Sequence, residues 1–97
     1  MQTPIQALNI LQQSITDNNF EFVPRKERSK APVTSAIAKI IVANLTINDY
    51  VKVELDHDGS GDYLWFFTAD DGIKYYIKFK ILQQNRIKFL SFHEAEY

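Results

Sequence analysis

The sequence of 97 residues contains no cysteine, and it lacks the long apolar runs and signals of several protein classes. Without cysteine, disulfides and thiolate-bound metals are excluded, and we expect a cytoplasmic protein. No apolar run approaches the roughly 18 residues that a membrane span requires. The first residues lack the basic and apolar stretches of a secretory signal. Because repeats, low-complexity tracts and linkers are also absent, we expect a single domain over residues 1–97.

Motifs for nucleotide binding, serine catalysis and metal binding are missing as well. The sequence has no Gly-x-Gly-x-x-Gly, no P-loop and no Gly-x-Ser-x-Gly elbow. Its only histidines are His57 and His93. Asp56, Asp58 and Asp62 lie in one acidic turn that resembles part of a calcium loop, but the closing glutamate is absent. We therefore expect neither a metal nor another cofactor, and we interpret the acidic segment as a turn.

Charge is unevenly distributed along the chain, although the net charge is only −1. Residues 25–30 carry four basic side chains and one acidic one, and residues 73–93 carry five basic and no acidic ones. Residues 49–71 carry seven acidic side chains and one lysine. Nucleic acids respond to a local basic patch rather than to total charge, so the basic segments favour RNA binding. Alternatively, the acidic segment binds a basic protein partner or pairs internally with the basic strands.

The spacing of apolar residues predicts an α+β fold with two N-terminal helices packed on an antiparallel β-meander. The first helix begins at Thr3-Pro4 and ends at residues 17–19, and a short strand follows at residues 20–23. The second helix opens at Pro32, with its apolar face on Val33, Ile37, Ile40, Ile41 and Leu45. Strands are expected at residues 50–56, 63–68, 73–82 and 86–92, with a tight turn at residues 70–72.

The strand at residues 73–82 is the most informative segment. Successive side chains of a strand point to opposite faces, which gives one apolar face and one face with Lys74, Tyr76, Lys78 and Lys80. A row of cations that includes a phenol suits chemistry on a polyanion. The alternative is an ordinary solvated face on which lysine is simply soluble.

Metal-independent RNA cleavage fits this composition. The attacking group is the 2′-hydroxyl of the RNA, so the protein needs only proton-transfer groups and cations around the phosphate. Lysine, tyrosine, arginine and histidine can supply these functions. Tyr76 lies between Lys74 and Lys78 on one face, and His93 follows the last strand.

Five short segments then occur in a characteristic order. They are Leu45-Thr-x-x-Asp49-Tyr50-Val-Lys52, Asp56-x-Asp58-Gly59, Gly61-Asp62-x-Leu-Trp65-x-Phe67, Asp71-Gly72-x-x-Tyr-Tyr76-Ile-Lys78-x-Lys80-Ile and Ser91-Phe92-His93-Glu-Ala-Glu-Tyr97. This order resembles MqsR-type toxins of the RelE-like group, from about Arg25 to the C-terminus. The resemblance implies an mRNA-cleaving toxin of a type II toxin–antitoxin module with mRNA as substrate and a cognate antitoxin as partner. It leaves involvement of the ribosome open.

The resemblance also implies a catalytic set, which consists of Lys52, Tyr76, Lys78 and His93. His93 stands where the best-known members have lysine. Phe66 stands where the family pattern can place a glutamine, and a phenyl ring cannot hydrogen-bond a phosphate or a base. A RelE-like module that binds RNA or protein without cleaving is therefore the alternative function. We expect further phosphate or substrate contacts from Lys80, Arg86, Arg25, Lys26 and Arg28.

Each of these side chains also has an ordinary structural interpretation. Tyr76 could stack on neighbouring strands, and Lys52 could pair with Glu54 or Asp56 on its own strand. Trp65 is expected in the core because it lies in an aromatic strand. His93 shares the side of the core residues if the last strand is regular, so it reaches the basic face only if that strand ends or bulges near Ser91. The basic loop could simply be solvated.

Overall fold

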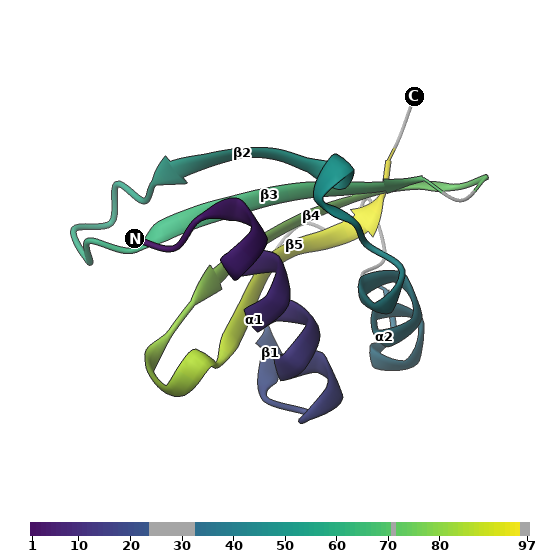
Figure 1. Cartoon of the computed structure of the whole chain (residues 1–97), viewed down its shortest axis with the longest axis horizontal. Helices are drawn as coiled ribbons and strands as arrows, with labels where there is room; N and C mark the ends of the chain where they lie inside the picture. The colour runs from purple at the N-terminus through teal and green to yellow at the C-terminus, as the bar shows by residue number, and fades with distance from the viewer. Residues whose placement is uncertain (24–32, 71, 96–97) are drawn as a thin grey trace.

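The computed structural model describes residues 1–23, 33–70 and 72–95, and these residues form an α+β fold (Figure 1). Its elements are α1 (Pro4–Thr16), β1 (Phe20–Phe22), α2 (Ser35–Ala43), β2 (Tyr50–Leu55), β3 (Tyr63–Asp70), β4 (Lys74–Ile81) and β5 (Ile87–Glu94). The short 3₁₀ helices η1 (Ile47–Asp49) and η2 (Gln83–Asn85) precede β2 and β5. None of the helices in the described ranges is long and apolar enough to cross a bilayer.

Local hydrogen bonds place α1 where the sequence predicts it. The backbone N–H of Gln6 donates to Thr3 Oγ1 at 3.2 Å, and Thr3 N–H donates to the Gln6 side chain at 2.9 Å. Pro4 occupies the first turn, where its missing N–H has no helical partner to lose. The helix ends before Asp17, and Asn18 adopts the left-handed conformation at φ 56°. The capping box therefore fixes the start of this helix, and the left-handed Asn18 marks its end.

The sheet has the strand order β1-β5-β4-β3-β2. Strands β2 to β5 form the predicted antiparallel meander, whereas β1 pairs in parallel with β5. The short strand predicted at residues 20–23 is present as β1, and both helices precede the meander as predicted. The helices are nevertheless not both N-terminal to the sheet, because β1 lies between them and joins it. Packing explains the position of β1, since Phe22 stacks on Phe89 with ring centroids 5.1 Å apart and Phe20 meets the same ring edge-on.

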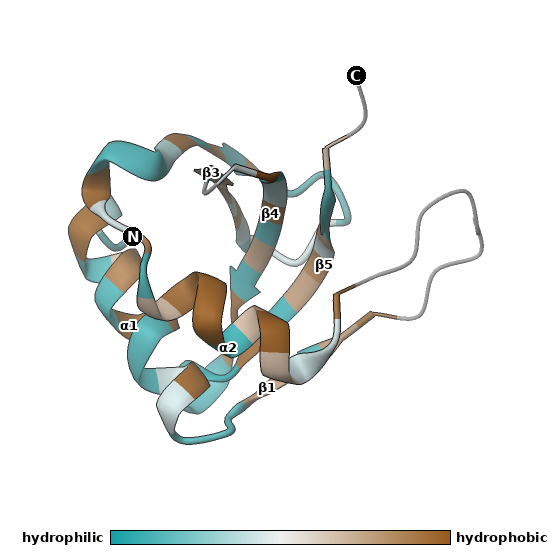
Figure 2. Ribbon diagram, turned by 90° about the vertical axis from the view of Figure 1, so that its right-hand side faces the viewer, coloured by the Kyte–Doolittle hydropathy of each residue, from teal (hydrophilic) through white to brown (hydrophobic). Residues whose placement is uncertain are grey.

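One face of the sheet packs against both helices and forms the core. Figure 2 shows α1 and α2 on this side, each with hydrophobic and hydrophilic segments. Gln12 joins them, because its side-chain amide donates to the carbonyl oxygens of Val42 and Leu45. Trp65 is 1% exposed, so its predicted place in the core is confirmed. The largest buried side chains are Trp65, Phe67, Phe79, Phe89, Leu11, Ile77, Ile87 and Val42.

The apolar face predicted for the second helix is correct in part, because Leu45 is buried and Val33 and Ile41 pack against the core, whereas Ile37 and Ile40 do not. Ala38 and Val42 are fully buried, while Ile37 and Ile40 are 44% and 64% exposed. The helix begins at Ser35 after the N-cap Thr34, whose hydroxyl accepts the N–H of Ile37 at 3.2 Å. Apolar spacing alone selected the larger isoleucines, whereas the helix turns its small alanine toward the core.

Candidate functional site

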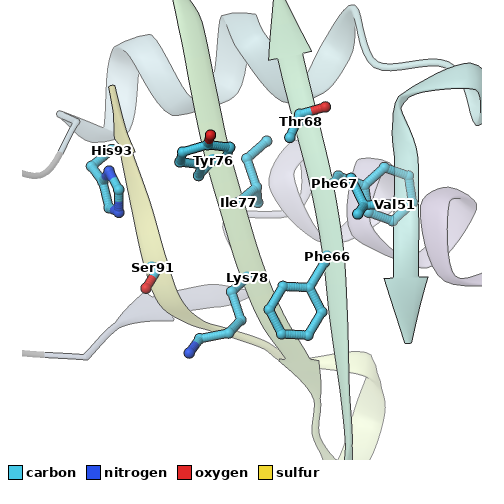
Figure 3. Close-up of a pocket in the computed structure, with 9 residues that line it drawn as sticks. All are labelled: Val51, Phe66, Phe67, Thr68, Tyr76, Ile77, Lys78, Ser91 and His93. Atoms are coloured by element: carbon cyan, nitrogen blue, oxygen red, sulfur yellow. The ribbon is translucent and has the colours of Figure 1, made fainter. Parts of the chain in front are cut away.

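The face of the sheet that points away from the helices carries the candidate site, and we call it the outer face. Two neighbouring rows of side chains cross it from β3 to β5 (Figure 3). Strand pairing sets Tyr76 between Thr68 and His93 in one row and Lys78 between Phe66 and Ser91 in the next. Directly paired residues on one face lie within side-chain contact of each other. Tyr76 and Lys78 of β4 thus lie beside side chains from both β3 and β5.

A β-bulge in β5 brings His93 to the outer face. Phe79 pairs with Phe89, but the preceding Lys78 pairs with Ser91, so Leu90 is an extra residue in β5. Before the bulge Phe89 points into the core, and beyond it Phe92 does so. We predicted that His93 reaches this face only if the strand ends or bulges near Ser91, and the register of β4 and β5 confirms such a bulge. The signal for it was present, because two core phenylalanines three residues apart cannot share one face of a regular strand.

Tyr76 and His93 are in contact across the two strands. Their ring centroids are 6.0 Å apart and the ring planes meet at 80°. The Tyr76 side chain is 42% exposed. His93 Nδ1 lies 2.9 Å from the carbonyl oxygen of Glu94, which can only accept a hydrogen bond. Nδ1 must therefore carry the proton, and the lone pair of neutral His93 is at Nε2.

Two lysines flank the phenyl ring of Phe66. Lys52 Nζ lies 4.7 Å from the ring centroid and Lys78 Nζ lies 5.8 Å from it. Lys52 also forms an ion pair with Glu54 at 2.8 Å, as one of the alternatives proposed. The hydrogen bond from Lys52 lowers the pKa of Glu54. Both side chains are about half exposed, and such exposed pairs are weak, so a phosphate can replace Glu54 at little cost.

Tyr76, His93 and Lys78 border a shallow depression of about 270 Å³. Among the residues that the structure describes, its lining contains aromatic, apolar and hydroxyl side chains together with one lysine, and it contains no carboxylate (Figure 3). An anion entering it meets cationic and hydrogen-bonding groups without like-charge repulsion. The residues that line it are Val51, Phe66, Phe67, Thr68, Tyr76, Ile77, Lys78, Ser91 and His93.

Lys80 has a different environment from the other lysines of the row. It is 5% exposed, and its ammonium group contacts the carboxylates of Asp56, Asp58 and Asp62, the last two at 2.8 and 3.6 Å. The hydrogen bonds to Asp56 and then Asp58 raise the pKa of Lys80, and the hydrogen bond from Lys80 lowers the pKa of Asp58. The acidic turn that resembles part of a calcium loop thus surrounds a cation of the chain itself, which agrees with the alternative that the acidic segment pairs internally with a basic strand. In this arrangement Lys80 is not available for the phosphate contact that we expected.

Arg86 is also engaged within the fold. Its Nε donates to Glu21 at 2.8 Å, and its terminal nitrogens donate to Asn19 and to the Phe20 carbonyl oxygen, each at 3.3 Å. These contacts tie β1 to the start of β5, so the expected phosphate contact of Arg86 competes with structural bonds. The remaining predicted contacts, Arg25, Lys26 and Arg28, lie outside the described residues.

Sequence reasoning did not assign Thr68, Ser91 or Val51 to the site. Thr68 had a detectable signal for its face, because a turn at residues 70–72 sets it opposite Lys74, on the same side as Tyr76. The ladder pairs Asp70 with Lys74 and so sets Thr68 opposite Tyr76 itself. Val51 did not, because a bulge between Tyr50 and Lys52 turns it to the outer face, where it is 52% exposed.

No protein-family model, curated protein or solved structure matches this chain. The resemblance to MqsR-type toxins thus depends on the quoted segments alone.

Proposed function

We propose that this chain is the toxin of a type II toxin–antitoxin module and that it cleaves mRNA as a metal-independent endoribonuclease. The observation that carries the proposal is the contact of Tyr76 with His93 beside Lys78, in a depression to which the described part of the chain contributes no carboxylate. Two proton-transfer groups and a cation are the minimum set for cleavage by the 2′-hydroxyl. The resemblance to MqsR-type toxins supports the same assignment.

In the proposed mechanism, a phosphodiester lies across the Tyr76 and His93 row. His93 Nε2 accepts the proton of the 2′-hydroxyl, because Nδ1 is held by the Glu94 carbonyl oxygen. The 2′-oxygen attacks phosphorus, and the bond to the 5′-oxygen breaks. The Tyr76 hydroxyl donates its proton to that leaving oxygen, while Lys78 stabilises the negative charge that accumulates on the phosphoryl oxygens. Cleavage leaves a 2′,3′-cyclic phosphate and a 5′-hydroxyl. Lys52 is the second cation, on the other side of Phe66.

A cleavage assay tests this proposal directly. Purified protein is incubated with a single-stranded RNA, with and without EDTA, and the product ends are identified by mass spectrometry. We expect cleavage to survive EDTA and to yield 2′,3′-cyclic phosphate ends. Induction of the chain alone in bacteria should arrest growth and deplete mRNA, and co-expression of a cognate antitoxin should restore growth. Loss of cleavage in EDTA would contradict the metal-independent mechanism.

The second candidate is a RelE-like module that binds RNA or protein with little or no catalysis. Phe66 favours it, because its ring supplies no hydrogen bond at a position where the family pattern can place a glutamine. The two candidates differ in one measurement. The module binds single-stranded RNA without producing cyclic phosphate ends, and its soluble expression leaves growth normal.

A further inference from the structure

The proposed reaction gives no role to three side chains of the outer rows, Phe66, Thr68 and Ser91, and Phe66 is the aromatic one among them. Its strand neighbours Trp65 and Phe67 are buried in the core at 1% exposure, whereas Phe66 points to the opposite face and is only partly buried. A phenyl ring on a cationic face gains little from burial there. Its position between Lys52 and Lys78 indicates a role on the solvent side of the sheet.

The ring and its neighbours match the chemistry of an unpaired nucleotide. Single-stranded nucleic acids are bound by aromatic side chains that stack on bases and by cations that hold the phosphates. Phe66 supplies the aromatic surface, and Lys52 and Lys78 supply a cation on each side of it. Both lysines have flexible stems, so they can move from the ring to the phosphates that flank a stacked base.

The adjoining depression can receive the edge of the base. Val51 and Ile77 give it apolar walls, and Thr68 and Ser91 give it hydroxyl groups that donate or accept hydrogen bonds. Its volume of about 270 Å³ leaves room for one planar base. A site of this kind selects single strands, because a base in a duplex cannot reach the ring.

We propose that Phe66 is the stacking platform for one unpaired base next to the phosphate at Tyr76 and His93. The substrate class is therefore single-stranded RNA with one base position that is read by stacking. This inference rests on the proposed function for the place of the phosphate, but base stacking itself requires only RNA binding.

Binding of a non-cleavable RNA separates the two claims. We use single-stranded 2′-O-methyl oligonucleotides, with an abasic residue moved through each position in turn, and measure affinity by fluorescence anisotropy. Stacking on an aromatic side chain is worth about 5- to 150-fold in affinity per base. We expect one position at which the abasic residue weakens binding to the wild-type chain by that factor.

Three variants identify the ring as the cause. Phe66→Leu keeps an apolar side chain without a ring, and it should abolish the dependence on the abasic position while leaving the salt dependence of binding unchanged. Phe66→Trp should retain or strengthen that position dependence. Lys78→Ala is the matched control, which should reduce the salt dependence and preserve the position effect. Circular dichroism confirms that each variant is folded, and the Trp variant keeps the test decisive if the Leu variant unfolds.

The outcomes are distinguishable. If wild type cleaves RNA but no abasic position weakens binding, the stacking site is wrong and the enzyme proposal stands. If one position matters and depends on Phe66 but RNA is never cleaved, the stacking site stands and the enzyme proposal falls. An equal position effect in Phe66→Leu and wild type overturns the role of the ring. Absence of RNA binding overturns both claims.

Discussion

Lys78 and Lys80 lie two residues apart on the same face of β4, and their surroundings are opposite. Lys78 borders a depression whose described lining residues include no carboxylate, whereas Lys80 is buried among three aspartates. The turn between β2 and β3 causes the difference, because its carboxylates reach the outer face only at the Lys80 end. The two lysines of this one row therefore have different roles. Lys78 is open to a ligand, and Lys80 holds the turn between β2 and β3.

We call the part of the β4 row with Tyr76 and Lys78 the open half, and the part with Lys80 the closed half. The open half should carry the chemistry, and Tyr76→Phe should have the largest effect on cleavage. The substitution removes only the hydroxyl, so the ring can still contact His93 and the fold is preserved. We expect cleavage to fall by roughly 10²- to 10⁴-fold, the usual contribution of a general acid or base. RNA affinity should stay within about twofold, as expected when only the transition state loses an interaction. Single-turnover rates and anisotropy measure the two effects, and a wild-type rate would move the proton-transfer role away from Tyr76.

Lys78→Ala tests whether the open half binds phosphate. A cation near phosphate acts on substrate and transition state alike, so both affinity and rate should fall, the affinity by roughly 10-fold. The slope of log affinity against log salt should decrease by about 0.7, the value for one phosphate of a single strand. The measurement is a salt titration from low to moderate ionic strength. An unchanged slope would remove Lys78 from the phosphate contacts.

Lys80→Met tests the closed half with a side chain of similar length and no charge. It removes the shared partner of Asp56, Asp58 and Asp62, so the loop loses its anchor. We expect the free energy of unfolding to fall by about 0.5–3 kcal/mol, the range of most destabilising point substitutions. The salt slope of RNA binding should equal that of wild type, in contrast to Lys78→Ala. Urea denaturation and the same salt titration give both numbers, and a reduced slope would show that RNA opens the loop to reach Lys80.

The sequence predicted which face each lysine occupies because strand alternation is a local property. It did not predict which lysine is already neutralised, because that depends on a turn about 20 residues earlier folding onto the sheet. Capping at Thr3 was predictable for the same local reason. The parallel pairing of β1 with β5 was not, because three residues carry too little pattern to name a partner.

The placement of His93 on the outer face was only partly predictable from the sequence. Its dependence on a bulge near Ser91 followed from parity, while the bulge itself required knowing that Phe89 and Phe92 are both core residues. Ile37 and Ile40 were wrongly assigned to the buried face of α2, because burial favours the residue that fits the space, and there the small Ala38 fits.

The closed half should also respond to acid, and this is the smallest effect that we expect. Lys80 and then Ser60 hydrogen-bond the Asp58 carboxylate and lower its pKa in the folded state. In the unfolded chain an aspartate titrates near about 3.9. Between the two values the unfolded chain binds more protons, so stability rises with pH. The contribution of Asp58 is present above about pH 4 and is lost as the pH falls through its folded-state pKa.

Asp58→Asn removes this titration while keeping a side chain of the same shape. Wild type should lose stability between pH 7 and pH 3, and the variant should lose less over the same interval. Asp70→Asn is the matched control, since Asp70 is an exposed aspartate at the far end of β3 and its replacement should leave the wild-type pH dependence intact. Urea midpoints at the two pH values measure the difference. If Asp58→Asn and wild type lose stability equally, the ion pair with Lys80 does not hold the loop in solution. Lys78 and Lys80 would then differ only in how deeply they are buried.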